Sequence, residues 1–184
     1  MTPLKLSQLP VQRNEGSTEF SISRFLVPWL CGYQGTALFM DCDMLVQCDL
    51  KNVFDMKDET DVQVVKHDYV PRETWKFHGN HQKVYPRKNW SSVMLFDCAR
   101  CAVLTPEYVQ SASAMELHQF LWTDLVGDLP GTLNHLVGEY QQGTPDIIHW
   151  TNGGPWLTKY AETEYAKEWQ KAKDDMSWYQ DDPG

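Results

Sequence analysis

The order of hydrophobic and polar positions along the chain predicts strands interleaved with helices. Apolar runs at 36–41, 61–66, 91–98 and 147–150 are short and bounded by glycine or polar residues, which is typical of buried strands. Stretches with helical spacing or helix-starting residues lie between them. Because strands that alternate with helices usually form parallel sheets, the pattern favours a three-layer α/β domain with a mainly parallel sheet.

Helical spacing predicts three further segments. Apolar residues recur every three to four positions over residues 17–30, where a Ser-Thr pair supplies the cap and Pro28 interrupts the pattern. Residues 106–126 carry further helix signals, beginning with a proline at the first turn. The tail from 156 to 178 alternates charged with aromatic residues and is predicted to form a helix on the body of the domain.

Proline, glycine and asparagine mark the connections. Residues 68–90 are rich in these and in histidine, and a segment of this length is typical of a functional loop. Residues 127–131 form a predicted turn, and 133–140 form either a short strand or a short helix. A glycine turn at 152–155 follows the last predicted strand.

Composition narrows the class of protein. The chain has 184 residues, 42% of them hydrophobic and 22% charged, which suits a single domain with a substantial core. We expect that core over residues 17–157 and a helical tail over 158–184. The formal charge of −9 argues against a nucleic-acid partner. The apolar runs are too short to span a membrane, and no signal segment opens the chain, so a cytoplasmic location is expected.

The five cysteines predict free thiols that are mostly buried, because their number is odd and no secretion signal accompanies them. Cys98 and Cys101 have the spacing of a zinc or redox pair, but a zinc site would need a second pair. His78 and His81 also have a metal-binding spacing, yet their polar, turn-rich surroundings favour exposure. Neither pair is therefore the leading candidate for a functional site.

Two aspartates follow the first predicted strand. Asp41 and Asp43 flank Cys42 at the end of the apolar run. Buried carboxylates are costly without a cation, and two closely spaced carboxylates suit a hard divalent ion that also holds phosphate oxygens. Alternate residues of a strand share a side, so both carboxylates could meet one ion while Cys42 faces the core. The alternative is a strand-end turn with two solvated aspartates.

A histidine at the end of the last predicted strand is the third candidate. His149 precedes a turn that contains Gly153 and Gly154. A strand-end imidazole can complete a metal site begun by two carboxylates, and glycines allow backbone amides to approach a phosphate. Arg24, on the helix before the first strand, could clamp phosphate or sugar hydroxyls. The alternatives are a lone histidine before a turn and a surface arginine.

Together these segments resemble the GT-A glycosyltransferases, specifically the family 8 type that includes glycogenin and bacterial lipopolysaccharide galactosyltransferases. The segment around Arg24 is similar to the family's arginine-bearing helix, and its spacing to the Asp41-Cys42-Asp43 segment fits. The resemblance covers about residues 17–157. Its further motifs are a strand usually written Asn-Ser-Gly-Val at 90–95, a closing His-x-x-Gly…Pro-Trp motif at 149–156, and two segments typical of a short bacterial and phage branch at 66–69 and 85–89.

The resemblance implies a mechanism and a set of site residues. It implies that Asp41, Asp43 and His149 hold Mn²⁺ or Mg²⁺ against the diphosphate of a nucleotide sugar, most simply a UDP-sugar. The ion acts there as a Lewis acid that neutralises charge on the leaving diphosphate. In retaining members the acceptor attacks the face that the diphosphate leaves, so no strong protein nucleophile is required. The other residues that the resemblance implies are Arg24, Lys66, Ser91, Gly153 and Gly154 for donor binding, and Asp128 and Asn134, which also suit turn and cap roles, for catalysis.

Three departures from the family pattern matter. Ser92 replaces the family's glycine after Ser91, and the asparagine of that motif is absent or displaced to Asn89. Gly154 stands where the family carries a lysine. Only about 40 residues precede Asp41, too few for the strand, helix and strand that hold the nucleotide base. We therefore expect an N-terminally truncated, minimal GT-A domain, in which base recognition is weakened, rebuilt by the loop at 68–90, or supplied by a partner chain or a second copy.

The leading hypothesis is a metal-dependent glycosyltransferase that moves a sugar from a UDP-sugar to a glycan or other acceptor with retention of configuration. One alternative is a hydrolase, with water as the acceptor of the sugar. Another is a catalytically degenerate domain that binds nucleotide, glycan or protein. The presence of all three metal-ligand candidates favours the enzyme, whereas the missing base-binding segment and the missing lysine favour the degenerate domain.

Overall fold

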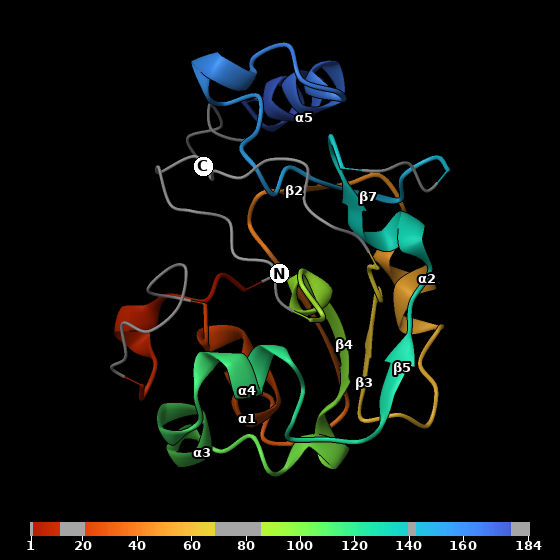
Figure 1. The fold of residues 1–184 in the computed structure, drawn as a ribbon. Helices are drawn as coiled ribbons and strands as arrows, with labels where there is room; N and C mark the ends of the chain where they lie inside the picture. Colours follow the sequence, from red (N-terminus) through yellow and green to blue (C-terminus); the bar gives the residue numbers. More distant parts are fainter. Residues whose placement is uncertain (1, 12–20, 69–85, 140–142, 178–184) are drawn as a thin grey trace, which may run out of the picture. The chain divides into compact units, whose positions relative to one another are not determined.

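The structure is a computed structural model (Figure 1). It describes residues 2–11, 21–68, 86–139 and 143–177. The chain divides into two compact units, each assembled from separate stretches of sequence. The first unit contains the described parts of 1–41, 49–68 and 85–131, and the second contains those of 42–48 and 132–184.

The first unit is built on a four-stranded mixed sheet. Its strand order is β1 (Thr36–Met40), β4 (Val93–Asp97), β3 (Val62–Val64) and β5 (Val126–Asp128). Strand β4 runs antiparallel to both β1 and β3, whereas β3 and β5 are parallel. The strands predicted at 36–41, 61–66 and 91–98 are thereby confirmed with somewhat shorter bounds.

The apolar composition of β4 explains its place inside this sheet. Residues 93–96 are all buried, as expected for a strand covered on both faces. Met94 and Phe96 belong to the main core of the unit, together with Phe25, Phe120 and Leu117. Figure 1 shows α1, α3 and α4 gathered on one side of the sheet and α2 on the other.

Local sequence signals set where the helices of the first unit begin. Thr105 caps α3, because its side chain accepts a hydrogen bond from the Tyr108 amide at 3.2 Å and Pro106 fills the first turn. Ser113 and Glu116 form a capping box at the start of α4. The helices of this unit are η1 (Leu6–Gln8), η2 (Ser23–Leu26), α1 (Val27–Leu30), α2 (Leu50–Phe54), η3 (Trp90–Ser92), η4 (Cys98–Cys101), α3 (Pro106–Ser111) and α4 (Ala114–His118).

The second unit has a three-stranded sheet. The order is β2 (Met44–Val46), β7 (Ile147–His149) and β6 (His135–Leu136), with β7 antiparallel to β2 and parallel to β6. All three residues of β7 are buried, which confirms the strand predicted at 147–150. The turn η5 (Gly131–Asn134) leads into β6, and η6 (Thr158–Tyr160) and α5 (Ala166–Ser177) follow β7.

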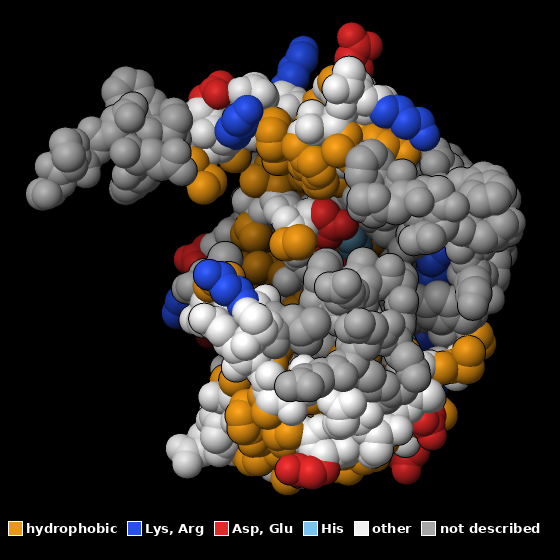
Figure 2. All heavy atoms as spheres, turned by 90° about the vertical axis from the view of Figure 1, so that its left-hand side faces the viewer, with side chains coloured by type: hydrophobic (Ala, Val, Ile, Leu, Met, Phe, Trp, Pro, Cys, Tyr) orange, Lys and Arg blue, Asp and Glu red, His pale blue; other side chains and the backbone are white. Residues whose placement is uncertain are grey.

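A cluster of tryptophans in edge-to-face and tilted contact holds the C-terminal segment of the second unit. The Trp156 ring lies 5.9 Å from that of Trp150 and 6.0 Å from that of Trp169 on α5. Trp150 is buried, and its indole N–H donates to the Glu164 carbonyl at 3.1 Å. Figure 2 shows hydrophobic side chains gathered among charged ones in its upper part, where α5 lies. Aromatic packing therefore fixes a helix whose own surface is mostly charged.

The expectation of a mainly parallel sheet is wrong. Among the described residues both sheets are mixed, and antiparallel pairs join β1 to β4, β3 to β4 and β2 to β7. The pattern of apolar runs locates strands, but it contains no information on which strand lies beside which. Among the strands that the structure describes, β3 and β5 alone match the predicted arrangement of parallel strands with helices, α3 and α4, between them in sequence.

Several local predictions need correction. The turn predicted at 127–131 contains the end of β5, and the helix predicted at 156–178 is confined to α5, because turns and η6 precede it. Strand β2 and helix α2 were not predicted. Residues 133–140, left open between strand and helix, include β6. Helix is confirmed within 106–126, as α3 and α4.

The cysteines are free, as predicted, but not mostly buried. Cys98 and Cys101 are buried, whereas Cys31 and Cys42 are exposed and Cys48 is intermediate. Cys42 therefore does not face the core. Burial, with a smaller contribution from Cys31, raises the pKa of the Cys98 thiol to about 12, which suits an inert thiol.

Some predictions fall on residues outside those described. These are the cap at residues 17–18, most of the loop at 68–90, and the His78/His81 pair. Within the described part of the chain, none of the helices is both long enough and apolar enough to cross a bilayer.

Candidate metal centre

The two aspartates lie in a short link between strands of different sheets. Strand β1 ends at Met40, and the Asp41 amide donates to the Ser92 carbonyl at 3.0 Å, which extends its pairing with the chain before β4. Two residues later, the Asp43 carbonyl accepts the Trp150 amide at 3.1 Å, just before β2 begins. Hydrogen bonds therefore fix the backbone at both aspartates.

A buried arginine holds the Asp41 carboxylate in the first unit. Arg24 Nη2 lies 2.8 Å from one carboxylate oxygen, and Nη1 donates to the other at 3.2 Å. The side chains of Arg24 and Asp41 are 8% and 19% exposed, so this fork-to-fork pair is largely removed from water. The sequence placed both residues at the site, and the structure brings them together.

The rest of the guanidinium is also occupied. Nη1 donates to the Ser91 carbonyl at 2.8 Å, and Nε donates to the Ser21 carbonyl at 2.9 Å. The Phe39 ring lies beneath the guanidinium carbon at 4.9 Å. Arg24 is therefore fixed by contacts within the protein, with all three of its nitrogens engaged.

A buried histidine faces Asp43 in the second unit. His149 lies in the central strand β7, opposite Met44 of β2, and is 2% exposed. Its Nε2 lies 3.4 Å from an Asp43 carboxylate oxygen, and its Nδ1 lies 2.8 Å from the side-chain oxygen of Asn134, which is fully buried. The imidazole is thus held on one side by an amide and faces a carboxylate on the other.

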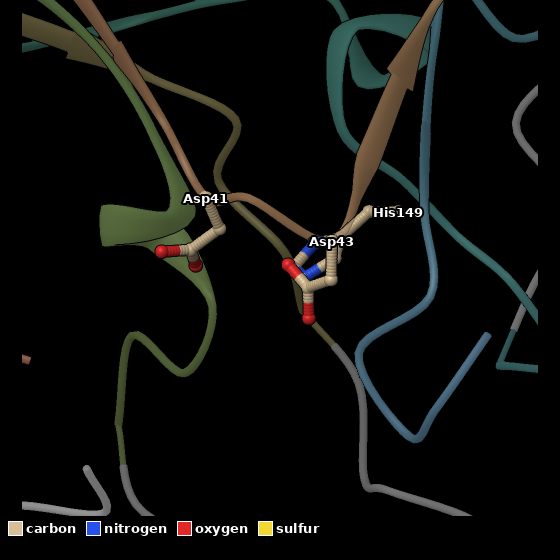
Figure 3. Close-up of side chains that lie close together, drawn as sticks. All are labelled: Asp41, Asp43 and His149. Carbon is tan, nitrogen blue, oxygen red and sulfur yellow. The ribbon is translucent and has the colours of Figure 1, made fainter. Parts of the chain in front are cut away.

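Asp41, Asp43 and His149 together form a candidate metal-binding group (Figure 3). One ligand atom from each lies within 4.8 Å of the other two. Asp41 and Asp43 are separated in the chain by Cys42 alone. Two carboxylate oxygens and an imidazole nitrogen are a donor set that divalent ions such as Mn²⁺ accept. Each carboxylate oxygen has two lone pairs, so Asp41 can bind Arg24 and an ion together.

Lys66 and Asp128, both implied as site residues, form an ion pair in the first unit. Lys66 Nζ lies 2.9 Å from an Asp128 oxygen, and the two side chains are 30% and 74% exposed. Asp128 ends β5, whose parallel partner β3 ends two residues before Lys66. Neighbouring parallel strands therefore deliver this lysine and this carboxylate to the same end of the sheet.

Ser91, which the resemblance implies for donor binding, lies against a histidine in the first unit. Its hydroxyl lies 2.7 Å from Nδ1 of His118, and the serine is buried. His118 ends α4 and packs edge-on against Phe25 at 5.3 Å. Sequence reasoning did not single out His118, because a lone histidine at a helix end carries no signal of a partner 27 residues away.

The two glycines of the turn after β7 are explained by aromatic packing. Gly153 has φ +124°, and a Cβ there would come within 2.6 Å of the Tyr160 ring. A Cβ on Gly154 would meet the Trp156 ring at 2.1 Å. These positions require glycine whether or not a phosphate approaches them.

Comparison with solved structures identifies what the fold resembles. The apo form of the glycosyltransferase GlyE from Streptococcus pneumoniae TIGR4 matches with a TM-score of 0.55 and 15% identity, over 85% of this chain and 43% of that one. A second GlyE structure matches with a TM-score of 0.53 and 14% identity, over 80% and 42%. The bifunctional glycosyltransferase WbbM matches with 0.54 and 15%, over 85% and 38%. The fold resembles that of glycosyltransferases.

A relative is found by sequence as well. Protein CDI of Arabidopsis thaliana is 42% identical over 164 residues, which covers 83% of this chain. The chain spans 63% of the length of that protein. No protein-family model matches the chain.

Proposed function

We propose that this chain is a metal-dependent glycosyltransferase domain that transfers a sugar from a nucleotide sugar to an acceptor. One observation carries the proposal: on a fold that resembles glycosyltransferases, Asp41, Asp43 and His149 come within 4.8 Å of one another. Two carboxylates and an imidazole whose ligand atoms lie this close together can share one divalent cation. The donor set fits Mn²⁺, and also Mg²⁺ where oxygen ligands predominate.

The residues of the candidate centre would have two kinds of role, metal ligation and positioning of the ligands. Asp43 and His149 would hold the cation, with Asp41 as the third ligand. The cation, when bound, supplies Lewis-acid stabilisation of the charge that develops on the departing diphosphate. Arg24 keeps the Asp41 carboxylate in one orientation through a bidentate contact, and Asn134 holds the imidazole of His149.

The finer features of the function belong to the same proposal. They are a family 8 relationship, a UDP-sugar as donor, retention of configuration, a glycan or other acceptor, and a cytoplasmic location. Lys66 is suited to contact the donor diphosphate, and Asp128 is suited to sit beside the transferred sugar, since their ion pair is exposed enough to open. Ser91, Gly153 and Gly154 would line the donor through their backbone.

To test this, the protein is incubated with Mn²⁺ and each of a panel of nucleotide sugars. Release of the nucleoside diphosphate is then measured with and without glycan acceptors. Release that depends on an acceptor supports a transferase. Release at the same rate in water alone points to a hydrolase. No release from any donor, together with no stabilisation of the protein by UDP and Mn²⁺, contradicts both enzymes.

A second candidate function is a domain that binds nucleotide sugar or glycan without catalysis. It is favoured by the tight Arg24–Asp41 pair, since both Asp41 oxygens already contact a guanidinium. The same panel distinguishes the two functions. Binding of UDP with Mn²⁺ but no turnover of any donor would favour the binding domain.

A further inference from the structure

The buried pair of Asn134 and His149 has a consequence for the chemistry of the imidazole. Asn134 ends η5 immediately before β6, and His149 ends the neighbouring strand β7. The Asn134 side-chain oxygen lies 2.8 Å from Nδ1, and the two residues are 0% and 2% exposed. Water therefore has almost no access to this contact.

The contact selects one form of the ring. A neutral imidazole has one N–H and one lone pair, and an amide oxygen can only accept a hydrogen bond. With the oxygen toward the ring, Nδ1 must carry the proton, and Nε2 is left with its lone pair. Nε2 is the atom that faces Asp43.

The distance on the other side of the ring agrees with this form. Nε2 lies 3.4 Å from the Asp43 oxygen, longer than an ordinary N–H···O hydrogen bond. Two ligand atoms that share an octahedral cation at about 2.1 Å stand about 3 Å apart. At 3.4 Å the two atoms are therefore not in an ordinary hydrogen bond and remain near enough for both to reach one ion.

We propose that Asn134 is a positioning residue that holds His149 in its Nδ1–H tautomer and so presents the Nε2 lone pair beside Asp43, where a divalent cation binds. The cation belongs to the proposed function, on which this inference rests, but the tautomer does not depend on it. Backbone hydrogen bonds support the same geometry, because the Val137 amide donates to the His149 carbonyl at 3.0 Å and the Trp150 amide to that of Asp43 at 3.1 Å. Asn134 itself does not need to touch a substrate.

The first experiment reads the tautomer directly. Two-bond ¹H–¹⁵N correlation spectra of the metal-free protein distinguish Nδ1–H from Nε2–H, and His149→Ala assigns the signals. We expect Nδ1–H. An Nε2–H tautomer would mean that the Asn134 amide is turned the other way and donates to the ring, and this result overturns the proposal whatever the protein does with metals.

The second experiment measures Mn²⁺ binding in the presence of UDP by electron paramagnetic resonance. Asn134→Leu keeps similar volume without the acceptor, and we expect it to weaken Mn²⁺ binding by about 10–100-fold and to reduce the ¹⁴N coupling from His149. Asn134→Asp keeps an acceptor oxygen and should remain close to wild type. If Asn134→Leu is folded and binds Mn²⁺ with wild-type affinity and coupling, the positioning role is refuted.

The outcomes also separate this inference from the proposed function. A wild-type protein that takes up no Mn²⁺ with UDP contradicts the metal-dependent function, while the tautomer spectrum still decides the role of Asn134. If Asn134→Leu does not fold, the proposal is tested by the tautomer spectrum of the wild type and by the Mn²⁺ affinity of Asn134→Asp. In that case Nδ1–H together with an unchanged Mn²⁺ affinity in Asn134→Asp supports the proposal, and loss of affinity in that variant opposes it.

Discussion

The two aspartates of one tripeptide lie in different settings. Asp41 belongs to the first unit, is 19% exposed, and has both oxygens against the buried guanidinium of Arg24. Asp43 belongs to the second unit, is 34% exposed, and faces the imidazole of His149. A guanidinium is always charged, whereas an imidazole offers either a proton or a lone pair. The first carboxylate is therefore anchored by an arginine, whereas the second faces a side chain that could share a metal ion with it.

This contrast divides the candidate centre into a structural half and a ligand-binding half. Removing Asp43 should cost binding and little stability, whereas disturbing Arg24 or Asp41 should cost stability as well. Variants of the residues around Asp41 and around Asp43 therefore test whether the two carboxylates have these different roles.

The largest effect is expected from Asp43→Asn. The change removes one charge and leaves the volume, so we expect Mn²⁺-dependent UDP binding to weaken by about 100-fold or more, because a metal–ligand contact is worth several kcal/mol. Isothermal calorimetry with and without Mn²⁺ measures this. Asp175→Asn, an exposed carboxylate on α5 of the same unit, is the matched control and should bind as wild type. Wild-type binding by Asp43→Asn would remove the metal hypothesis.

The next largest effect is expected from Arg24→Met. It leaves the Asp41 carboxylate largely buried without its cation, which typically lowers the free energy of unfolding by about 3 kcal/mol. Urea denaturation measures the loss. The double variant Arg24→Met/Asp41→Asn should recover part of it, because no unpaired charge then remains. A single variant as stable as wild type would show that the ion pair is not the anchor.

A smaller effect is expected from Gly154→Ala in the second unit. The new methyl group would displace the Trp156 ring from its contacts with Trp150 and Trp169, so we expect a loss of about 2 kcal/mol in the free energy of unfolding. In a Trp156→Leu background the same change should cost much less. If instead Gly154→Ala keeps its stability but loses UDP binding, the glycine serves the ligand and not the packing.

The smallest effect is expected from pH. Burial lowers the pKa of His135 in the second unit from 6.5, with nearby Glu164 opposing the shift. Because the unfolded chain binds this proton more readily, the stabilisation is complete above about pH 6.5 and falls as the pH drops toward the folded value. We expect wild-type stability to decline between pH 7.5 and 5.5 and the decline to be shallower in His135→Phe. Urea midpoints across this range give the comparison, and equal slopes would contradict it.

The local sequence predicted much of the fold where a single segment suffices. Strands β1, β3, β4 and β7 follow from apolar runs, and the starts of α3 and α4 follow from Thr105-Pro106 and from the Ser113–Glu116 capping box. Strand β2 and helix α2 were missed, and their length does not explain this, because β3 and β7 also have three residues and α4 also has five. The predicted strand direction was wrong as well, because the pairing of a strand depends on segments that are distant in the sequence.

In the candidate centre, too, the sequence predicted the residues themselves but not their distant partners. The residue types and order of Asp41, Asp43 and His149 could be read from the chain, and their proximity agrees with that prediction. The hydrogen-bonding partners of the site residues could not be predicted from the sequence. Arg24 on Asp41, Asn134 on His149 and His118 on Ser91 each join residues 15 to 27 positions apart.

The amino-acid sequence alone shows which groups are available: two carboxylates at the end of one strand, a histidine at the end of another, and an arginine in the helical segment before the first strand. The tertiary structure decided what each group does, because pairing β7 with β2 brings His149 to Asp43 and pairing β4 with β1 carries Ser91 to Arg24. Hydrogen bonds and metal coordination act only over a few ångströms. A chemical role is therefore set by spatial neighbours, and sequence neighbours alone do not fix it.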